Sequence, residues 1–353
     1  MTIKDCFSKL PKVKAKDRIL LLTHNDLDAG GSTIVAKCVF PSIEVMHCSN
    51  NNMSWNIRST ILDDNTVARY DYIIACDISC KAEDAEVINK SKNAKKLIVL
   101  DHHPTATGLN QYKWASVVVD IIEDCDRIDR YPEKKGHSSG ASLMYDYLNF
   151  LGLIPENLKD QLRELAFIVS TYDTWDWVDI FNKSDAVKDC YDFTLLTRIY
   201  SLEGFEKKMY QTIIKNAETG SKDVYSADDY LLLETEKNRI NYALQGIAKS
   251  IHTGNMKIGN DYYSIVFCNM TDYTQETFEF MKTKYPDYDY YFMMMGSQVA
   301  IRATKADIHA GMFAKERGGG GHAGAAGVPI PFATQVSRLA ESLGVEIIVD
   351  ERL

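Results

Sequence analysis

The chain has 353 residues, of which 45% are hydrophobic and 25% charged, and its formal net charge is −9. This is a globular composition, and a single hydrophobic core stops growing near about 250–300 residues, so the length predicts two domains. The negative charge disfavours long polyanionic duplex as a partner unless a local positive patch or bound metal ions reverse the field. Short anionic substrates are compatible with this net charge.

The cysteine spacing and the N-terminal sequence give information about the cellular compartment of the protein. The eight cysteines include no C-x-x-C pair, which argues against a zinc ribbon or a thioredoxin-type motif. The N-terminal stretch "MTIKDCFSKLPKVKAKDR" contains lysines throughout and no apolar signal-peptide core, and the chain has no apolar run of about 18 residues. We therefore expect a cytoplasmic protein with no membrane partner.

The first 125 residues alternate short apolar runs with polar stretches that are compatible with helices. Near-continuous apolar strands between helices indicate a parallel sheet that is covered on both faces. The expected strands are 18–22, 43–47, 70–76, 96–100 and 116–122.

The remainder of the chain predicts helices and then a second α/β unit. Residues 138–152 and 157–172 have helical patterns, and two long amphipathic helices are expected between 201 and 253. The predicted organisation is therefore a parallel-sheet N-terminal α/β domain joined by helices to a smaller α/β C-terminal domain. Its boundaries are residues 1–200 for the first domain, 201–253 for the helical linker and 254–353 for the second domain.

Acidic and histidine side chains follow three of the expected strands. Because open parallel sheets gather their ligand sites at the carboxyl ends of the strands, these side chains should meet in space. Single D-x-D pairs are often helix caps or turn residues, but three such clusters at equivalent positions predict a metal centre. The clusters are His24, Asp26 and Asp28 after "RILLL", Asp77 after "YIIAC", and Asp101, His102 and His103 after "KLIVL".

The ligand types narrow the choice of metal. Imidazole and carboxylate without thiolate suit manganese, iron or zinc, and a carboxylate-rich site favours Mn²⁺ or Mg²⁺. Several carboxylates around one ion would leave excess negative charge, so two ions about 3.5–4 Å apart that share a bridging aspartate are the better interpretation. Such a pair activates water and holds phosphoryl oxygens, which predicts phosphoester hydrolysis.

These motifs resemble the DHH phosphoesterase family. "HNDLDAGGS" is similar to the first family motif, Asp77 to the second, "DHH" at 101–103 to the third, and Asp173 in "STYDTWDW" to the fourth. Asp176 lies three residues beyond Asp173 and could take its place, although the "DT" context favours Asp173.

The resemblance also implies a role for each of these residues. His103 would contact the scissile phosphate or transfer a proton, and Asp101 would orient the neighbouring histidines. Of two manganese ions, one would be bound by His24 and Asp26 and the other by Asp28, His102 and Asp173, with Asp77 as the bridge.

The glycine run "FAKERGGGGHAGAAG" at 313–327 is the second unusual stretch. It formally contains G-x-G-x-x-G, but a charged helix and not a strand is expected before it, so a dinucleotide fingerprint is rejected. Consecutive glycines suit a backbone that approaches an anion and directs N–H groups at it. The run resembles the DHH-associated domain of the first type, which implies that Gly319, Gly320, Gly321, His322 and Arg302 bind the non-scissile part of a nucleotide, beside Lys305, Lys315 and Arg317.

The expected function is manganese-dependent hydrolysis of short single-stranded oligonucleotides or dinucleotides to mononucleotides, by an enzyme that resembles the nano-RNase type of oligoribonuclease and could form a homodimer. The alternatives are a cyclic or linear dinucleotide phosphodiesterase, a 3′-phosphoadenosine 5′-phosphate phosphatase, a RecJ-like single-strand DNA exonuclease, or a nucleotide-binding sensor without turnover. "GHSSG" at 136–140 matches G-x-S-x-G, but no strand is expected before it and a serine hydrolase is rejected.

Overall fold

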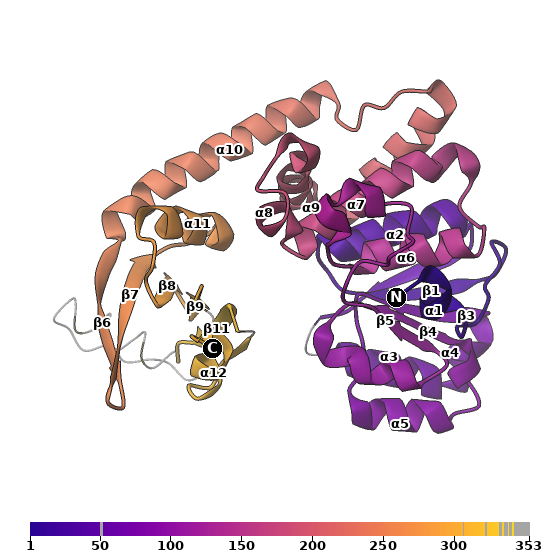
Figure 1. Ribbon diagram of the computed structural model, residues 1–353, viewed down its shortest axis with the longest axis horizontal. Helices are drawn as coiled ribbons and strands as arrows, with labels where there is room; N and C mark the ends of the chain where they lie inside the picture. The colour runs from indigo at the N-terminus through magenta and orange to yellow at the C-terminus, as the bar shows by residue number, and fades with distance from the viewer. Residues whose placement is uncertain are drawn as a thin grey trace, which may run out of the picture. The chain divides into compact units, whose positions relative to one another are not determined.

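The computed structural model describes residues 1–49, 52–305, 307–321 and 323–331, together with residues 334, 338 and 341. The chain divides into two compact units, Met1–Leu233 and Glu234–Leu353 (Figure 1). Each unit contains one β-sheet. Among the described residues, no helix has both the length and the apolar character that are needed to cross a membrane.

The N-terminal unit contains a five-stranded sheet in the order β2-β1-β3-β4-β5. All neighbouring strands are parallel, so the predicted α/β class is confirmed. Because β1 lies between β2 and β3, the connections leave it in opposite directions, and this reversal creates the crevice at which such sheets bind ligands. The strands are β1 (Ile19–Thr23), β2 (Ile43–His47), β3 (Tyr72–Cys76), β4 (Leu97–Asp101) and β5 (Ala115–Val117).

Helices cover both faces of this sheet, as the near-continuous apolar strands predicted (Figure 1). Alternate strand residues such as Leu20, Leu22 and Val99 pack with Ile57 and Ile88 in one buried cluster. The helices of that face are α3 (Met53–Leu62), α4 (Asp64–Arg69) and α5 (Ala82–Lys90), and those of the opposite face include α2 (Leu27–Val39), α6 (Gly140–Phe150) and α7 (Lys159–Asp173).

The fifth strand is shorter than the apolar run at 116–122 suggested, and the expectation of a strand through residue 122 is wrong. The side chain of Asn110 caps the edge of β5, since it donates to the carbonyl oxygen of Val117 and accepts from its N–H, both at 2.8 Å. Asn110 belongs to the 3₁₀ helix η2 (Pro104–Gln111). The sheet therefore ends where a side-chain amide replaces a further strand.

The helices that follow α7 differ from the expected pair within 201–253. The first long helix, α9 (Asp189–Thr219), begins well before residue 201 and contains one non-helical residue, Ser201, at φ 63°. The second is α10 (Ala227–Ile247), and the short α8 (Asp176–Asp179) precedes both. The division between the two units falls within α10, after Leu233.

The C-terminal unit contains a six-stranded mixed sheet in the order β10-β11-β9-β8-β7-β6. The strands β7 and β8 are parallel and are connected through α11, whereas the other neighbours are antiparallel. The elements are β6 (His252–Ile258), β7 (Asp261–Asn269), α11 (Thr274–Lys284), β8 (Tyr290–Met295), β9 (Gln298–Arg302), α12 (Ala310–Lys315), β10 (Gly320–Gly321) and β11 (Ala325–Pro329).

Candidate metal centre

The first part of the site is the turn that joins β1 to α2. Asp26 is the N-cap of α2, and its carboxylate accepts a 3.0 Å hydrogen bond from the N–H of Ala29. A second carboxylate oxygen lies 2.7 Å from Nδ1 of His24. Helix capping therefore explains why an aspartate occurs here, but it leaves the His24 ring beside the carboxylate as a pair of potential ligands.

Asp77 follows β3 and has a strained backbone. Its φ of 61° lies in the left-handed region, which aspartate tolerates better than most residues. Its N–H donates to the carbonyl oxygen of Leu100 at 3.0 Å, so the sheet holds this conformation in place. Nε2 of His102 lies 3.2 Å from Oδ1 of Asp77 and 3.4 Å from Oδ2 of Asp173.

Asp28 is buried and is bound by the first turn of α6. Ser139, the N-cap residue, donates from its hydroxyl to Oδ1 of Asp28 at 2.7 Å, and the N–H of Ala141 donates to the same oxygen at 2.9 Å. The N–H of Gly140 donates to Oδ2 at 2.5 Å. The positive end of a helix thus stabilises this buried carboxylate and fixes its orientation.

Asp101 is fully buried at the end of β4 and organises both histidines of the DHH triplet. Its Oδ1 accepts from the backbone N–H of His102 at 2.8 Å and lies 2.8 Å from Nδ1 of His103. Burial alone would raise the pKa of Asp101, but the hydrogen bond from His103 and the charges of His103 and His102 together outweigh it, so the pKa is lowered. The same bond raises the pKa of His103.

The predicted ligands come together in groups that could hold cations. Within each group, one ligand atom per residue lies within 4.8 Å of the others. Two of these groups share no residue and match the two predicted ligand sets, with Asp77 in the first group. The third group places a ligand atom of His103 within the same distance of Asp77 and His102. The groups are His24, Asp26 and Asp77; Asp28, His102 and Asp173; and Asp77, His102 and His103.

The electrostatics of the site fit divalent cations. Burial, together with repulsion from Asp28 and Asp26, raises the pKa of both Asp77 and Asp173, and burial also raises the pKa of Asp28. Burial lowers the pKa of His102, which favours the neutral imidazole that binds metals. In the described part of the chain, no lysine or arginine forms an ion pair with these acids. Bound cations would supply the missing positive charge.

The structure distinguishes Asp173 from Asp176, the alternative ligand of the fourth motif. Asp173 is the last residue of α7 and lies in the second ligand group. Asp176 is buried and is instead engaged by His137, whose backbone N–H donates to one carboxylate oxygen at 2.8 Å while its Nδ1 lies 2.6 Å from the other. This geometry favours Asp173 as the fourth-motif ligand.

Two supporting contacts were not predicted. Ser139 and Gly140, which belong to the "GHSSG" motif, bind the carboxylate of Asp28. The sequence indicates this contact only indirectly, because a serine before an apolar helix is a typical helix cap. The Nδ1 atom of His47 lies 2.7 Å from the carbonyl oxygen of His24, and its Nε2 atom lies 3.2 Å from Glu206. No sequence spacing indicates this contact, because it joins the end of β2 to α9.

The glycine run forms a tight hairpin. A Cβ on Gly319 would lie 2.0 Å from the carbonyl oxygen of Gly327, and a Cβ on Gly321, at φ 146°, would lie 2.4 Å from that of Ala325. Close packing of β10 on β11 therefore requires glycine at both positions, whereas a Cβ on Gly320 would meet nothing within 4 Å. His322 lies outside the described residues.

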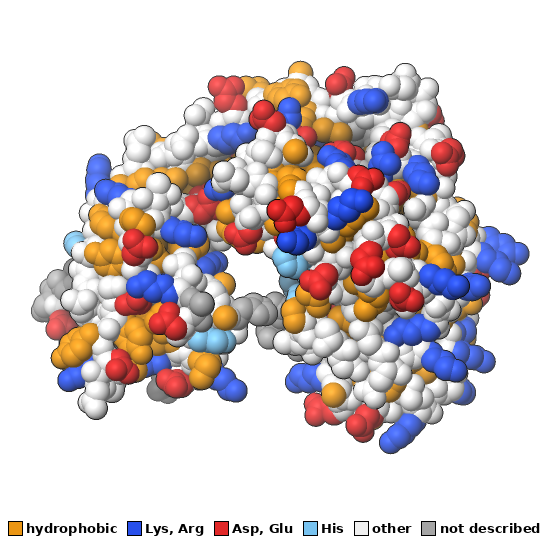
Figure 2. Space-filling model, in the orientation of Figure 1, with side chains coloured by type: hydrophobic (Ala, Val, Ile, Leu, Met, Phe, Trp, Pro, Cys, Tyr) orange, Lys and Arg blue, Asp and Glu red, His pale blue; other side chains and the backbone are white. Residues whose placement is uncertain are grey.

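The cations near this hairpin are partly neutralised. Lys305 is paired with Asp289 at 2.5 Å, and Arg317 is paired with Glu316 at 3.3 Å. Arg302, in β9, forms no ion pair with any described residue, and burial lowers its pKa. On the face shown in Figure 2, basic and acidic side chains are interspersed in each unit, with no continuous basic surface. Arg302 and Lys315 are therefore the predicted phosphate-binding cations that have no carboxylate partner among the described residues.

Comparisons with known proteins identify the family. Residues 18–169 match the DHH family, N-terminal domain. The chain is 28% identical over 333 residues to oligoribonuclease NrnB of Bacillus subtilis (strain 168), a match that covers 92% of this chain and 76% of that protein.

Solved structures also align with this chain. The crystal structure of CDC45 from Entamoeba histolytica aligns with a TM-score of 0.51 and 10% identity, over 94% of this chain and 90% of that chain. RecJ of Thermus thermophilus, crystallised with Mn²⁺, aligns with a TM-score of 0.47 and 13% identity, over 97% of this chain and 53% of that chain. Residues 18–169 therefore form a DHH-family N-terminal domain, and the chain is a phosphoester-hydrolysing enzyme.

Proposed function

We propose that this enzyme uses two divalent ions, Mn²⁺ in preference to Mg²⁺, to hydrolyse short single-stranded oligonucleotides to mononucleotides. The convergence of two separate histidine–aspartate groups at one edge of the parallel sheet carries the proposal. The similarity to oligoribonuclease NrnB along 92% of the chain supports short RNA as the substrate. A cytoplasmic location and a homodimer remain predictions.

In this proposal the two disjoint groups hold one ion each. His24 and Asp26 bind the first, Asp28, His102 and Asp173 bind the second, and Asp77 bridges them. When bound, two such ions lower the pKa of a water and stabilise the charge that develops on phosphoryl oxygens. The oxygen-rich donor set, without thiolate, supports Mn²⁺ or Mg²⁺ over softer metals.

His103 and Asp101 are proposed to serve the phosphate and the leaving group. Asp101 accepts the hydrogen bond from Nδ1 of His103, so it fixes the ring and leaves Nε2 available. Because Asp101 raises the pKa of His103, the imidazole retains its proton at higher pH than a free histidine does. A protonated Nε2 can hydrogen-bond a phosphate oxygen or donate a proton to the departing hydroxyl.

The C-terminal unit is proposed to bind the end of the substrate that is not cleaved. Arg302 supplies a cation without a carboxylate partner among the described residues, and Gly320 offers a backbone with open space above it. Gly319 and Gly321 would hold that backbone in place through the hairpin, and His322 completes the proposed set.

A substrate panel tests the proposal. The purified protein with Mn²⁺ is incubated with RNA dinucleotides, RNA of about twenty nucleotides, single-stranded DNA, cyclic dinucleotides and 3′-phosphoadenosine 5′-phosphate. We expect the highest kcat/KM with RNA dinucleotides. Equal rates on long DNA would favour the RecJ-like alternative, and no turnover with tight nucleotide binding would favour the sensor.

His103→Ala should abolish turnover without lowering Tm, and full activity in this variant would contradict its assigned role.

Metal binding has a readout that does not depend on turnover. A ligand at a hundred times its Kd stabilises the folded state by about 2.7 kcal/mol, which corresponds to a rise in Tm of roughly 5–10 °C for a unit of this size. We expect Mn²⁺ to raise the Tm of the wild type and to leave that of Asp77→Asn unchanged. Equal shifts in both proteins would place the ions elsewhere.

A further inference from the structure

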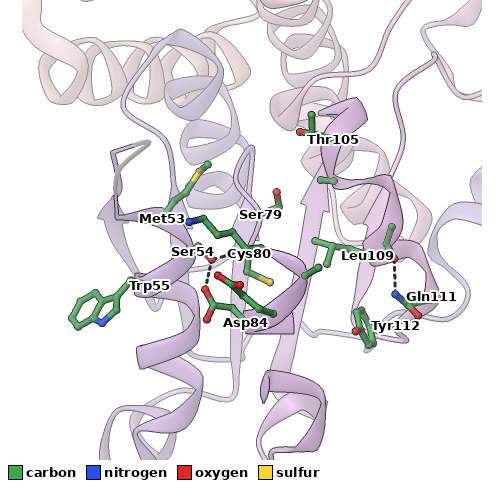
Figure 3. Close-up of a pocket in the computed structure, with 15 residues that line it drawn as sticks. Met53, Ser54, Trp55, Ser79, Cys80, Asp84, Thr105, Leu109, Gln111 and Tyr112 are labelled. Carbon is green, nitrogen blue, oxygen red and sulfur yellow. Dashed lines mark hydrogen bonds between the residues drawn. The ribbon is translucent and has the colours of Figure 1, made fainter. Parts of the chain in front are cut away.

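A cavity outside the candidate metal centre lies in the N-terminal unit, with a volume of about 580 Å³ (Figure 3). This volume is within the range of small-molecule binding sites. Three segments form its wall: the start of α3 from Met53, the stretch from Ser79 to Asp84 that leads into α5, and η2 with the residue that follows it, Tyr112.

The cavity adjoins the candidate metal centre through two shared loops. Ser79 lines the cavity and lies two residues after Asp77, and Thr105 lines it two residues after His103. Both loops leave the carboxyl edge of the sheet, where β3 and β4 are neighbours. A phosphodiester at the metal centre would therefore have one of its two organic substituents beside this cavity.

The wall of the cavity suits a nucleobase. Met53 and Leu109 lie on opposite sides of the cavity, and the side chains of Ser79 and Thr105 lie in the upper part of the view (Figure 3). Apolar side chains and a methionine sulfur make favourable contacts with aromatic rings. Trp55 is 67% exposed and points away from the cavity, so it does not supply the stacking surface.

The polar groups at the base of the cavity are already paired. Ser54 donates to Asp84 at 2.5 Å (Figure 3). Arg58 donates to the other oxygen of that carboxylate at 2.9 Å. Lys81, which is exposed at the wall, has no carboxylate within ion-pair distance among the residues that the structure describes. Its ammonium group is therefore available to an anion in a protein whose net charge is −9.

We propose that this cavity binds one of the two nucleosides that flank the scissile phosphate, with the base between Met53 and Leu109 and a phosphate near Lys81. The substrate class in this inference rests on the proposed function. The cavity would add binding energy for a base at the reacting end of the substrate, so that a dinucleotide is bound through both of its nucleosides.

Gly108 allows the cavity to be filled without strain. It lines the cavity, and a Cβ built on it would meet no atom within 4 Å. Gly108→Trp should therefore fold normally and obstruct the base, while Lys81→Glu should repel the phosphate. Gly246→Trp, at an exposed glycine of α10 with equally open surroundings, is the matched control.

The test combines binding and turnover. AMP is titrated by calorimetry into the full-length wild type and each variant, and kcat/KM is measured for an RNA dinucleotide with Mn²⁺. We expect Gly108→Trp and Lys81→Glu each to weaken AMP binding and to lower kcat/KM about tenfold, and Gly246→Trp to match the wild type. Wild-type affinity for AMP in both cavity variants, or no AMP binding by the wild type, would overturn the inference.

The binding measurement separates this inference from the proposed function. If the wild type cleaves no oligonucleotide but AMP binding is still weakened selectively in Gly108→Trp and Lys81→Glu, the proposed function fails and the nucleoside site stands. If the wild type cleaves dinucleotides and the cavity variants do so with unchanged KM, the function stands and the site is elsewhere.

Discussion

The hydroxyl of Ser139 donates a 2.7 Å hydrogen bond to Asp28, a buried carboxylate that lies 111 residues earlier in the chain. The backbone N–H groups of Gly140 and Ala141 bind the same carboxylate, so three donors from the first turn of α6 hold it. Each carboxylate oxygen has two lone pairs, and Asp28 can therefore accept these bonds and still face a cation. The α6 terminus thus sets the direction in which Oδ2 of Asp28 presents its remaining lone pair.

Ser139→Ala should weaken metal binding and activity together. Partners that orient a metal ligand typically contribute 10–100-fold in affinity or activity, so we expect the Kd for Mn²⁺ to rise by about tenfold or more and kcat to fall. Calorimetric titration with Mn²⁺ measures the first effect directly. Ser139→Thr retains the hydroxyl and should restore most of the affinity; an alanine variant with wild-type Mn²⁺ affinity would show that the two backbone donors suffice.

Gly140→Ala should disrupt the site through sterics. A Cβ at this position would lie 2.5 Å from Cβ of Asp77 and 2.7 Å from a carboxylate oxygen of Asp28, and neither is the end of a flexible chain. We expect activity to fall by at least a hundredfold and Tm to fall. Gly246→Ala, where the Cβ meets open space, is the control and should retain both. Normal turnover in Gly140→Ala would mean that the sheet edge is more deformable than the packing indicates.

The sequence predicts the central strands of the N-terminal sheet well because they are buried on both faces. Residues 19–22 and 97–100 are apolar without interruption, and that pattern depends on burial alone. The end of β5 could not be predicted in this way, since it depends on the Asn110 side chain and not on hydrophobicity. The start of α9 was missed although Cys190, Phe193 and Leu196 have helical spacing.

Apart from Asp173, which ends α7, the proposed ligands were predictable because each follows a strand of one parallel sheet, and the topology brings such positions together. Of the residues that orient the ligands, Asp101 was predicted from the sequence, but those on other elements were not. Ser139, Gly140 and His47 act through contacts between elements that are distant in sequence, and such contacts depend on the angle at which helices pack on the sheet. The motif that contains Ser139 matches a pattern for a nucleophilic serine, whereas in the structure this serine caps α6 and binds Asp28.

Asp77 combines a predicted bridging carboxylate with a backbone φ of 61°. Asparagine tolerates this region nearly as well as aspartate, whereas a residue without a short polar side chain costs roughly 1 kcal/mol or more there. We expect Asp77→Asn to keep the fold and lose turnover, and Asp77→Ala to lose turnover and also unfold at lower denaturant concentration. Comparing the two variants by urea denaturation and by hydrolysis of a dinucleotide separates the two roles. Substantial activity in Asp77→Asn would contradict the bridging role.

Arg127 and Asp146 form a buried ion pair that anchors α6, the helix whose first turn binds Asp28. The guanidinium donates to both carboxylate oxygens, at 2.5 and 2.8 Å, and the two side chains are 1% and 0% exposed. Asp146→Ala leaves a buried charge without its partner, which typically costs about 3–5 kcal/mol. We expect the combined Arg127→Met and Asp146→Leu variant to recover most of that loss, because an apolar pair needs no compensating charge.

The four tryptophans make this prediction measurable, since Trp55, Trp114, Trp175 and Trp177 all belong to the unit Met1–Leu233. Urea denaturation followed by tryptophan fluorescence therefore reports on this unit. The midpoint should fall steeply in Asp146→Ala and return toward the wild-type value in the double variant. A double variant as unstable as Asp146→Ala would mean that packing around α6, and not the uncompensated charge, dominates the loss. Recovered stability without recovered turnover would show that the ion pair also sets the angle at which α6 presents Ser139 to Asp28.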